Sequence, residues 1–208
     1  QVDKFLIKSF WILETGGNIL KLFSAKNKSK ADESVQTSLS KANFHPFMEI
    51  ENYSPYQQKQ YELYSSLREA VPIIDAAINK LIRLIGTFEI ECKDKVTTKA
   101  LNSFLNNVQV NAGSKGVNQF IYSYFDSLLT YGTAVGEIVL SKDKSSVSAL
   151  YNASLDDVKL QSGDSPLSMD IMVRNSDCTY SKVKYPQLIC VSLLNPEDGK
   201  AEGRSILK

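Results

Sequence analysis

Few residues in this chain could carry out chemistry, and they stand far apart in the sequence. The adjacent carboxylates of Asp156 and Asp157 could hold a divalent cation, and the lone histidine, His45, could serve as a general acid or base. Simpler explanations exist, because Asp156 and Asp157 directly precede a predicted strand, where a solvated turn is expected, and His45 precedes Pro46 in a predicted loop. We therefore predict no catalytic residue, no metal site, no cofactor and no enzymatic activity. The alternative is a catalytic site completed by residues beyond this chain.

The sequence lacks the common motifs that bind phosphate or metal, or that present a nucleophile. It contains no glycine-rich phosphate loop and no Gly-x-Ser-x-Gly turn, and a single histidine excludes two-histidine zinc motifs within the chain. The three cysteines, Cys92, Cys178 and Cys190, are too widely spaced for a local zinc site, and their odd number predicts reduced thiols. Cys190 lies in an apolar run and is expected to be a small core residue.

The charge of the chain is balanced, with 24 basic and 23 acidic residues. A protein of this composition has no general electrostatic attraction for nucleic acid. Lys21, Lys26, Lys28 and Lys30 form a small basic cluster that could contact nucleic acid or an acidic partner, although a solvated arm is the simpler interpretation. No apolar run reaches the roughly 18 residues that a membrane span needs, so no membrane partner is predicted.

The first 53 residues are predicted to be an N-terminal arm and linker. Residues 5–13 form a short, mixed but mainly apolar segment that could be a strand or a helix, which Gly16 and Gly17 would end in either case. Residues 24–42 are rich in lysine, serine, asparagine and glutamine and offer little to bury, which favours a flexible arm. The folded domain is expected to cover residues 54–208.

Four helices are predicted in the first half of that domain. The first begins at Ser54-Pro55, and Pro72 ends it and starts the second, which Gly86 closes. A short strand is expected at 88–92, and a third helix at 98–108. The fourth helix, 117–131, carries a broad apolar stripe and ends at Gly132. The stripe consists of Val117, Phe120, Ile121, Tyr124, Phe125, Leu128 and Leu129.

Strands dominate after Gly132. Residues 133–140 are rich in strand-forming types, and further strands are predicted at 147–151, 158–161, 169–174, 179–185 and 188–194. The last of these is apolar on both faces, which predicts a central position in its sheet. The expected fold class is α+β, with a helical N-terminal half packed on a small, mixed and mainly antiparallel sheet.

Four segments, in this order, resemble the N-terminal half of a tailed-bacteriophage portal protein. Residues 64–81 resemble a pair of portal helices that breaks at a proline, and residues 128–138 resemble a helix that ends in glycine before a strand. Residues 150–158 are similar to the leucine and Asp-x-Val step that follows in that family. Residues 195–207 resemble a loop with the pattern Gly-x-Ser-x-Leu.

The resemblance implies a structural subunit of the portal ring, the conduit at one capsid vertex for packaging and ejection of double-stranded DNA. The chain would correspond to the outer wing and be truncated before the stem and clip. Its implied partners are further copies in a dodecameric homo-oligomer ring, the major capsid protein, scaffold, terminase and a head–tail adaptor. Its implied location is the virion, and the host cytoplasm during assembly. The alternative function is a nucleic-acid-binding module that uses the basic N-terminal arm. No residue is assigned to DNA contact.

Overall fold

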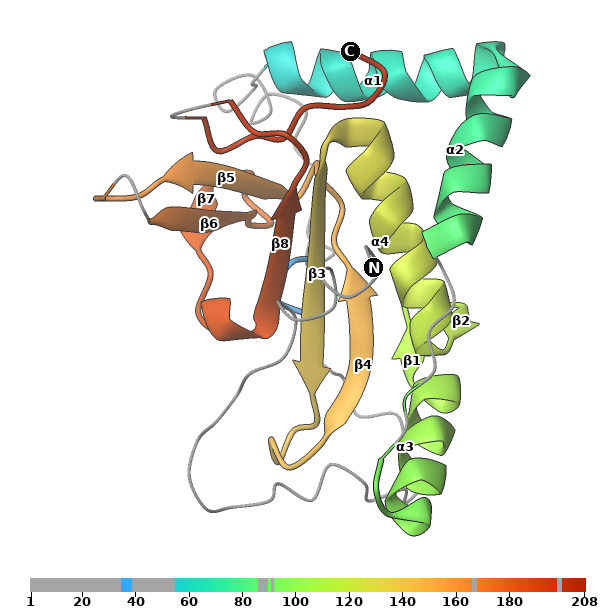
Figure 1. Ribbon diagram of the computed structural model, residues 1–208. Helices are drawn as coiled ribbons and strands as arrows, with labels where there is room; N and C mark the ends of the chain where they lie inside the picture. Colours follow the sequence, from blue (N-terminus) through green and yellow to red (C-terminus); the bar gives the residue numbers. More distant parts are fainter. Residues whose placement is uncertain (1–34, 39–54, 86–89, 91, 166–167, 198–199) are drawn as a thin grey trace.

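Four helices and two β-sheets form the part of the chain that the computed structural model describes, which is residues 35–38, 55–85, 90, 92–165, 168–197 and 200–208 (Figure 1). The helices are α1 (Pro55–Ala70), α2 (Pro72–Ile85), α3 (Lys95–Asn107) and α4 (Val117–Tyr131). The larger sheet contains β1 (Gln109–Val110), β2 (Ser114–Lys115), β3 (Thr133–Leu140), β4 (Val147–Asn152) and β8 (Ile189–Leu193). The smaller sheet contains β5 (Val158–Ser162), β6 (Met169–Arg174) and β7 (Tyr180–Lys182), and a short 3-10 helix, η1 (Pro186–Leu188), precedes β8.

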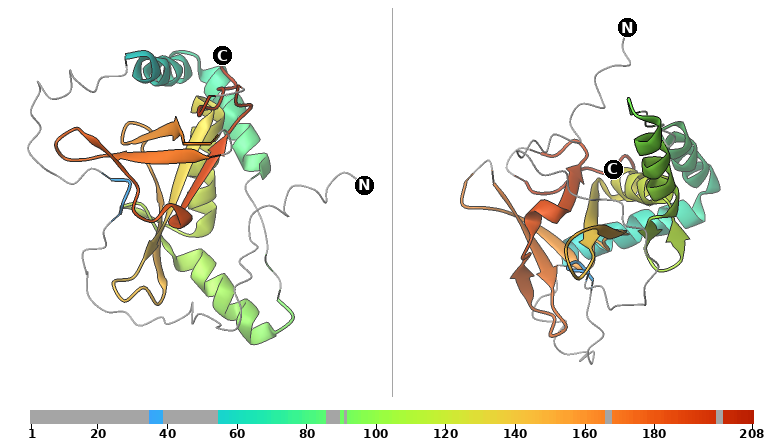
Figure 2. Two further views of the ribbon diagram at one scale, coloured as in Figure 1. Left: turned by 90° about the vertical axis from the view of Figure 1, so that its left-hand side faces the viewer. Right: turned by 90° about the horizontal axis from the view of Figure 1, so that it is seen from below.

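This arrangement confirms the predicted α+β fold. The strand order of the larger sheet is β2–β1–β4–β3–β8, and its strand pairs are antiparallel except for β1 and β4, which run parallel. The smaller sheet is antiparallel, in the order β5–β6–β7. Figure 2 shows the helices on one side of the larger sheet and the smaller sheet on the other.

Two helices joined at a proline lie along the outside of the molecule. α1 and α2 are separated by Val71 alone, which confirms the predicted break at Pro72. Pro72 has no N–H to donate, and inside a helix its ring would clash with the preceding turn, so α1 ends and α2 starts in a new direction. α2 packs on α4 and buries Ile78 and Ile82.

The two faces of α2 give a test of this packing. Ile82 is fully buried, whereas Ile73 is 76% exposed on the same helix. We expect Ile82→Val to lower the free energy of unfolding by about 1 kcal/mol, because it removes one buried methylene. Ile73→Val should leave it unchanged within the error of urea titration. Equal effects of the two substitutions would contradict the placement of α2.

The junction between α4 and β3 forms as the sequence predicts. Gly132 adopts the left-handed conformation, with a φ of 79°, and its N–H donates to the Leu128 carbonyl at 2.9 Å. β3 then forms an inner strand of the larger sheet, between β4 and β8. One of its faces meets α4, where Gly136 lies against the rings of Phe120 and Tyr124. The opposite face meets the smaller sheet, where Val135 packs in one apolar cluster with Val158.

The predicted central position of residues 188–194 is wrong. β8 pairs with β3 alone among the described strands and is therefore an edge strand. Both faces of β8 are apolar because other elements cover each of them, and not because the strand is central. Ile189 and Val191 pack toward the smaller sheet, while the neighbouring Ser192 accepts a hydrogen bond from Tyr124 of α4. Apolar residues on both faces thus report that both faces are covered, and they say nothing about whether both edges are paired.

Several element bounds also differ from the prediction. α3 starts at Lys95, three residues earlier than expected, because the Asp94 side chain caps it by accepting from the N–H groups of Val96 and Thr97. The expected strand 179–185 is shorter, as β7 covers Tyr180–Lys182, and the β1–β2 hairpin was not predicted. Of the strand expected at 88–92, Ile90 and Cys92 are described and neither is in a strand, while the rest lies outside the described residues.

The predicted arm is only partly described. Residues 1–34 and 39–54, including the apolar segment 5–13, lie outside the described residues. Residues 35–38 are described, and they lie against the folded body with Thr37 completely buried. The expectation that residues 24–42 have little to bury is therefore wrong for this short part, because its polar groups find hydrogen-bond partners on β3.

Candidate functional site

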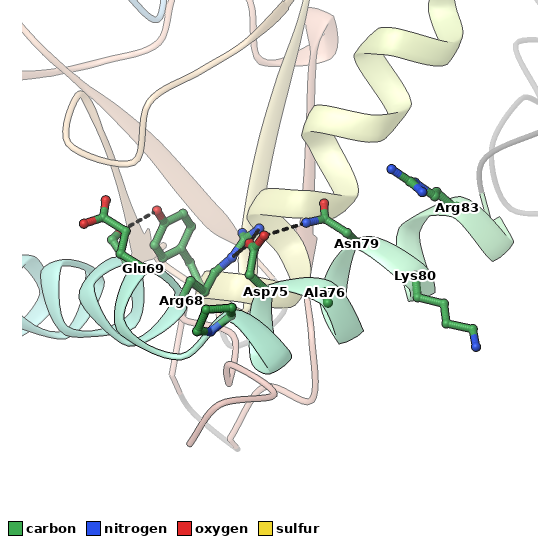
Figure 3. Close-up of a pocket in the computed structure, with 10 residues that line it drawn as sticks. Arg68, Glu69, Asp75, Ala76, Asn79, Lys80 and Arg83 are labelled. Carbon is green, nitrogen blue, oxygen red and sulfur yellow. Dashed lines mark hydrogen bonds and ion pairs between the residues drawn. The ribbon is translucent and has the colours of Figure 1, made fainter.

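An open hollow of about 980 Å³ lies in the angle between α1 and α2 (Figure 3). Most of its lining side chains are charged or polar, and it has no histidine or cysteine in its lining. Glu69, Lys80 and Arg83 are exposed, and Lys80 and Arg83 point in different directions. The remaining lining residues are Ser65, Arg68, Pro72, Asp75, Ala76, Asn79 and Tyr131. Such groups can recognise a partner through charge and hydrogen bonds.

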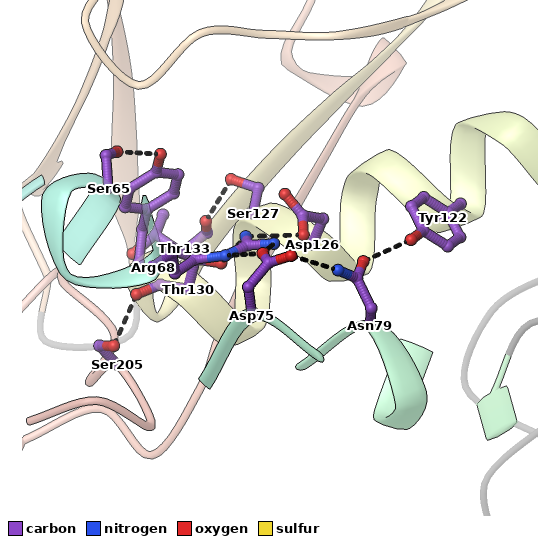
Figure 4. Close-up of polar contacts among 11 residues, drawn as sticks. Ser65, Arg68, Asp75, Asn79, Tyr122, Asp126, Ser127, Thr130, Thr133 and Ser205 are labelled. Atoms are coloured by element: carbon purple, nitrogen blue, oxygen red, sulfur yellow. Dashed lines mark hydrogen bonds and ion pairs between the residues drawn. The ribbon is translucent and has the colours of Figure 1, made fainter. Parts of the chain in front are cut away.

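Arg68 connects the three helices that meet at the floor of this hollow (Figure 4). Its side chain is 15% exposed, and its Nε and Nη2 both donate to Oδ1 of Asp75 on α2, at 2.9 and 2.5 Å. Its Nη1 donates to Oδ1 of Asp126 at 2.8 Å and to Oγ1 of Thr130 at 2.7 Å, both on α4. A planar guanidinium suits this role because its donors have fixed directions. The side chain therefore fixes the angle between α1 and α2 relative to α4.

The network continues from Asp75 along α2. Nδ2 of Asn79 donates to Oδ2 of Asp75 at 2.8 Å, and the Tyr122 hydroxyl of α4 donates to Oδ1 of Asn79 at 2.5 Å. Burial lowers the pKa of Arg68, but hydrogen bonds and charge from Asp75 and Asp126 outweigh it, and the pKa is raised above its usual value. The guanidinium therefore stays charged, and the network acts as a permanent ionic joint, which we call the α1–α2 elbow.

The C-terminal segment 203–207 closes the other side of the α4–β3 junction. The Ser205 hydroxyl donates to the Thr130 carbonyl at 2.5 Å, and the Gly203 N–H donates to Oγ1 of Thr133 at 3.2 Å. Gly203 and Gly132 are in direct backbone contact, since a Cβ on Gly203 would overlap the Gly132 carbonyl. Two glycines are needed here because neither backbone leaves room for a side chain.

The same junction raises the pKa of Tyr61 on α1 to about 12. Burial is the main cause, and the nearby carboxylates of Glu202 and Asp156 add to it. The ring of Tyr61 meets that of Tyr131 edge-on, with a centroid distance of 5.2 Å. The phenol therefore stays neutral at physiological pH and serves packing.

The residues that the sequence singled out for chemistry do not assemble into a site. Asp156 is exposed, but Asp157 is buried, so the expectation of a solvated turn is wrong for Asp157, whose main-chain carbonyl accepts from the Arg174 N–H at 2.8 Å. Within the described residues, no three histidine, cysteine or acidic side chains group closely enough to hold a metal ion. His45 and the lysine cluster Lys21, Lys26, Lys28 and Lys30 lie outside the described residues.

All three cysteines are free thiols. Cys178 is buried, whereas Cys92 and Cys190 are half-buried. The prediction that Cys190 is a small core residue is wrong, because the residue is only half-buried. Its Sγ lies 3.5 Å from the Tyr124 hydroxyl.

Sequence reasoning did not identify Arg68, Asp75 and Asp126 as a set. A signal was available, because Arg68 and Asp75 flank the proline break on two helices whose other faces are apolar. Their partner Asp126 could not be named, since it stands 58 residues after Arg68 and only the fold brings the two together.

No protein-family model matches the chain, and no curated protein matches it by sequence. Among the described residues, none of the helices has the length and apolar character needed to cross a lipid bilayer.

Proposed function

We propose that the chain is a structural part of the portal ring of a tailed bacteriophage, in the position of the outer wing. Its partners in this role are further copies of itself and the neighbouring capsid, scaffold, terminase and head–tail proteins. Double-stranded DNA passes through the assembled ring. The near-zero net charge suits a part that need not hold DNA tightly, because strong phosphate contacts would slow its passage.

One support is that the four segments that carry the resemblance are neighbours in space. Residues 64–81 and 128–138 are joined by Arg68 and Thr130, and residues 195–207 reach the same place through Ser205 and Thr130. Residues 150–158 run beside β3, where the Ala153 N–H donates to the Val135 carbonyl at 2.9 Å. Segment 128–138 therefore contacts each of the other three segments in the folded domain.

The observation that carries the proposal is the outward face of α2. Four side chains on this face are exposed and apolar, at helical spacing, and we call them the α2 outer face: Ile73, Ala77, Leu81 and Leu84. An isolated exposed apolar residue is ordinary, but an apolar stripe on the outside of a helix is typical of a surface that contacts another protein. No described segment of this chain covers it.

A ring needs such a face on every subunit, matched to a different surface on the next. Contacts of this heterologous type close into a ring only if the rotation from one copy to the next divides a full turn evenly, which requires each copy to hold its contact face at a constant angle. The α1–α2 elbow meets that need, because Arg68 binds residues of α2 and α4 at once and holds α2 at a set angle.

Electron microscopy of the full-length protein tests the proposal. We expect annular particles for the wild type, and we expect Leu84→Glu to weaken subunit association by roughly 30-fold, which corresponds to about 2 kcal/mol for a residue in the centre of an interface. Val96→Glu is the matched control, because Val96 on α3 is 74% exposed and Leu84 is 76% exposed.

The two variants separate the possible results. Rings that form with Val96→Glu and fail with Leu84→Glu support the proposal. Monomers of the wild-type protein at all concentrations would contradict the portal role. Rings that tolerate Leu84→Glu would remove the α2 outer face from the contact.

A further inference from the structure

Glu137 departs from the pattern of the strand that contains it. Side chains alternate between the two faces of β3, and Gly136 faces the rings of Phe120 and Tyr124 on α4. Val135, Glu137 and Val139 therefore share the opposite face. Both valines are buried there, and a third apolar residue would be expected between them. A glutamate stands in that position instead and is 2% exposed.

Both oxygens of the Glu137 carboxylate accept hydrogen bonds from a short segment about a hundred residues earlier in the chain. The Gln36 N–H donates to its Oε1 at 2.9 Å, while the Thr37 N–H and hydroxyl donate to its Oε2 at 3.1 and 2.7 Å. Two successive backbone N–H groups and one hydroxyl thus surround a single carboxylate. On its other side, Oε1 of Gln36 accepts from the Tyr185 N–H at 3.0 Å. We call residues 35–38 the strap.

We propose that the Glu137 carboxylate is a peptide-binding site, which the chain's own strap fills and can leave without unfolding of the sheet. Its ligand is a short turn that offers two free backbone N–H groups, the second on a threonine or serine. The proposal is independent of ring assembly.

The polar character of the contact is the reason for reversibility. A face that stays closed is best covered by apolar residues, because burying a carboxylate carries a desolvation cost that hydrogen bonds must offset. A carboxylate that is uncovered from time to time becomes hydrated, whereas an uncovered apolar residue would not. The four hydrogen bonds that Gln36 and Thr37 make to Glu137 and Tyr185 can each be replaced by a hydrogen bond to water when the strap leaves.

The hydrogen bonds of Gln36 also show where the strap lies on the folded body. The strap lies on the face of the sheet away from α4, beside the loop between β7 and β8 that contains Tyr185.

Amide hydrogen exchange of the full chain tests the proposal. In the wild type, the amides of Gln36 and Thr37 should exchange at least about ten-fold more slowly than in an unstructured peptide, and much faster than the amides of β3. Glu137→Gln should remove that protection, because its NH2 group faces backbone donors and it lacks the charge, while β3 keeps its own protection. Thr37→Val should have the same effect and Thr37→Ser should not. Glu69→Gln, at an exposed glutamate of α1, is the matched control.

A second measurement tests the site as a receptor. A labelled peptide with the sequence of residues 33–40 should bind the full-chain Thr37→Val variant, in which the strap is released, and should not bind the Thr37→Val/Glu137→Gln double variant. Fluorescence anisotropy measures both.

Four results would overturn the proposal. Protection of Gln36 and Thr37 that survives Glu137→Gln would show that the carboxylate does not hold the strap. Loss of β3 protection to the same extent would make the strap part of a permanent core. Protection that depends on protein concentration would assign the strap to a second copy of the chain. Equal peptide binding by the two variants would place the peptide elsewhere.

Discussion

Replacing Gly132 by alanine should lower the free energy of unfolding by about 3 kcal/mol. The left-handed conformation of Gly132, with a φ of 79°, costs a residue with a side chain roughly 1–2 kcal/mol. The new Cβ would also lie 2.5–2.6 Å from backbone atoms of Gly203 and Arg204, and overpacking of this kind costs roughly 1–3 kcal/mol. Backbone atoms cannot avoid the new Cβ by changing rotamer as a side chain can. Segment 203–207 must therefore move away from α4.

Urea unfolding followed by circular dichroism measures this effect, with Gly113→Ala as the control. Gly113 has no positive φ and no atom within 4 Å of a Cβ built on it. Its replacement should therefore leave the stability unchanged or raise it slightly. If the two alanine variants unfold at the same urea concentration, the close contact between Gly132 and segment 203–207 does not exist in solution.

Local structure was predictable because local residues determine it. The apolar stripe of α4, its end at Gly132 and the start of β3 all follow from residue types within one or two turns. The break at Pro72 follows equally from the covalent geometry of proline. The start of α3 was missed because the apolar pattern begins later than the cap, whereas Asp94 determines where the helix begins.

Relations between distant segments were not predictable from the same signals. The pattern of residues 188–194 reports covered faces but not paired edges, which is why β8 was wrongly placed at the centre. The strap was not predictable because Gln36 and Thr37 are polar and therefore add nothing to a hydrophobic pattern that would predict burial. Their N–H groups reach the Glu137 carboxylate only in the folded protein. Glu137 offered a signal, as a lone charge in an otherwise apolar strand.

The same limit applies to the α1–α2 elbow, because one of the carboxylates that Arg68 binds, that of Asp126, stands 58 residues later in the chain. We expect Arg68→Met to lower the free energy of unfolding by about 2 kcal/mol, since one hydrogen bond to a charged group contributes roughly 1.5–3 kcal/mol and four such donors are not additive. Methionine keeps the apolar contacts of the side chain but has no donor. The carboxylates of Asp75 and Asp126 are 42% and 34% exposed, so water can partly replace the guanidinium, which keeps the loss from being larger.

Arg83→Met is the matched control, because Arg83 lines the same hollow and has no hydrogen bond or ion pair among the described residues. Arg68→Lys should lie between the two, since an ammonium group cannot reach both carboxylates with the geometry of a guanidinium. If Arg68→Met and Arg83→Met are equally stable in urea titration, the elbow does not stabilise the fold. If Arg68→Met is less stable but the full-length protein still forms rings, the angle of α2 is set by the buried contacts of Ile78 and Ile82 instead, and Arg68 contributes to stability alone.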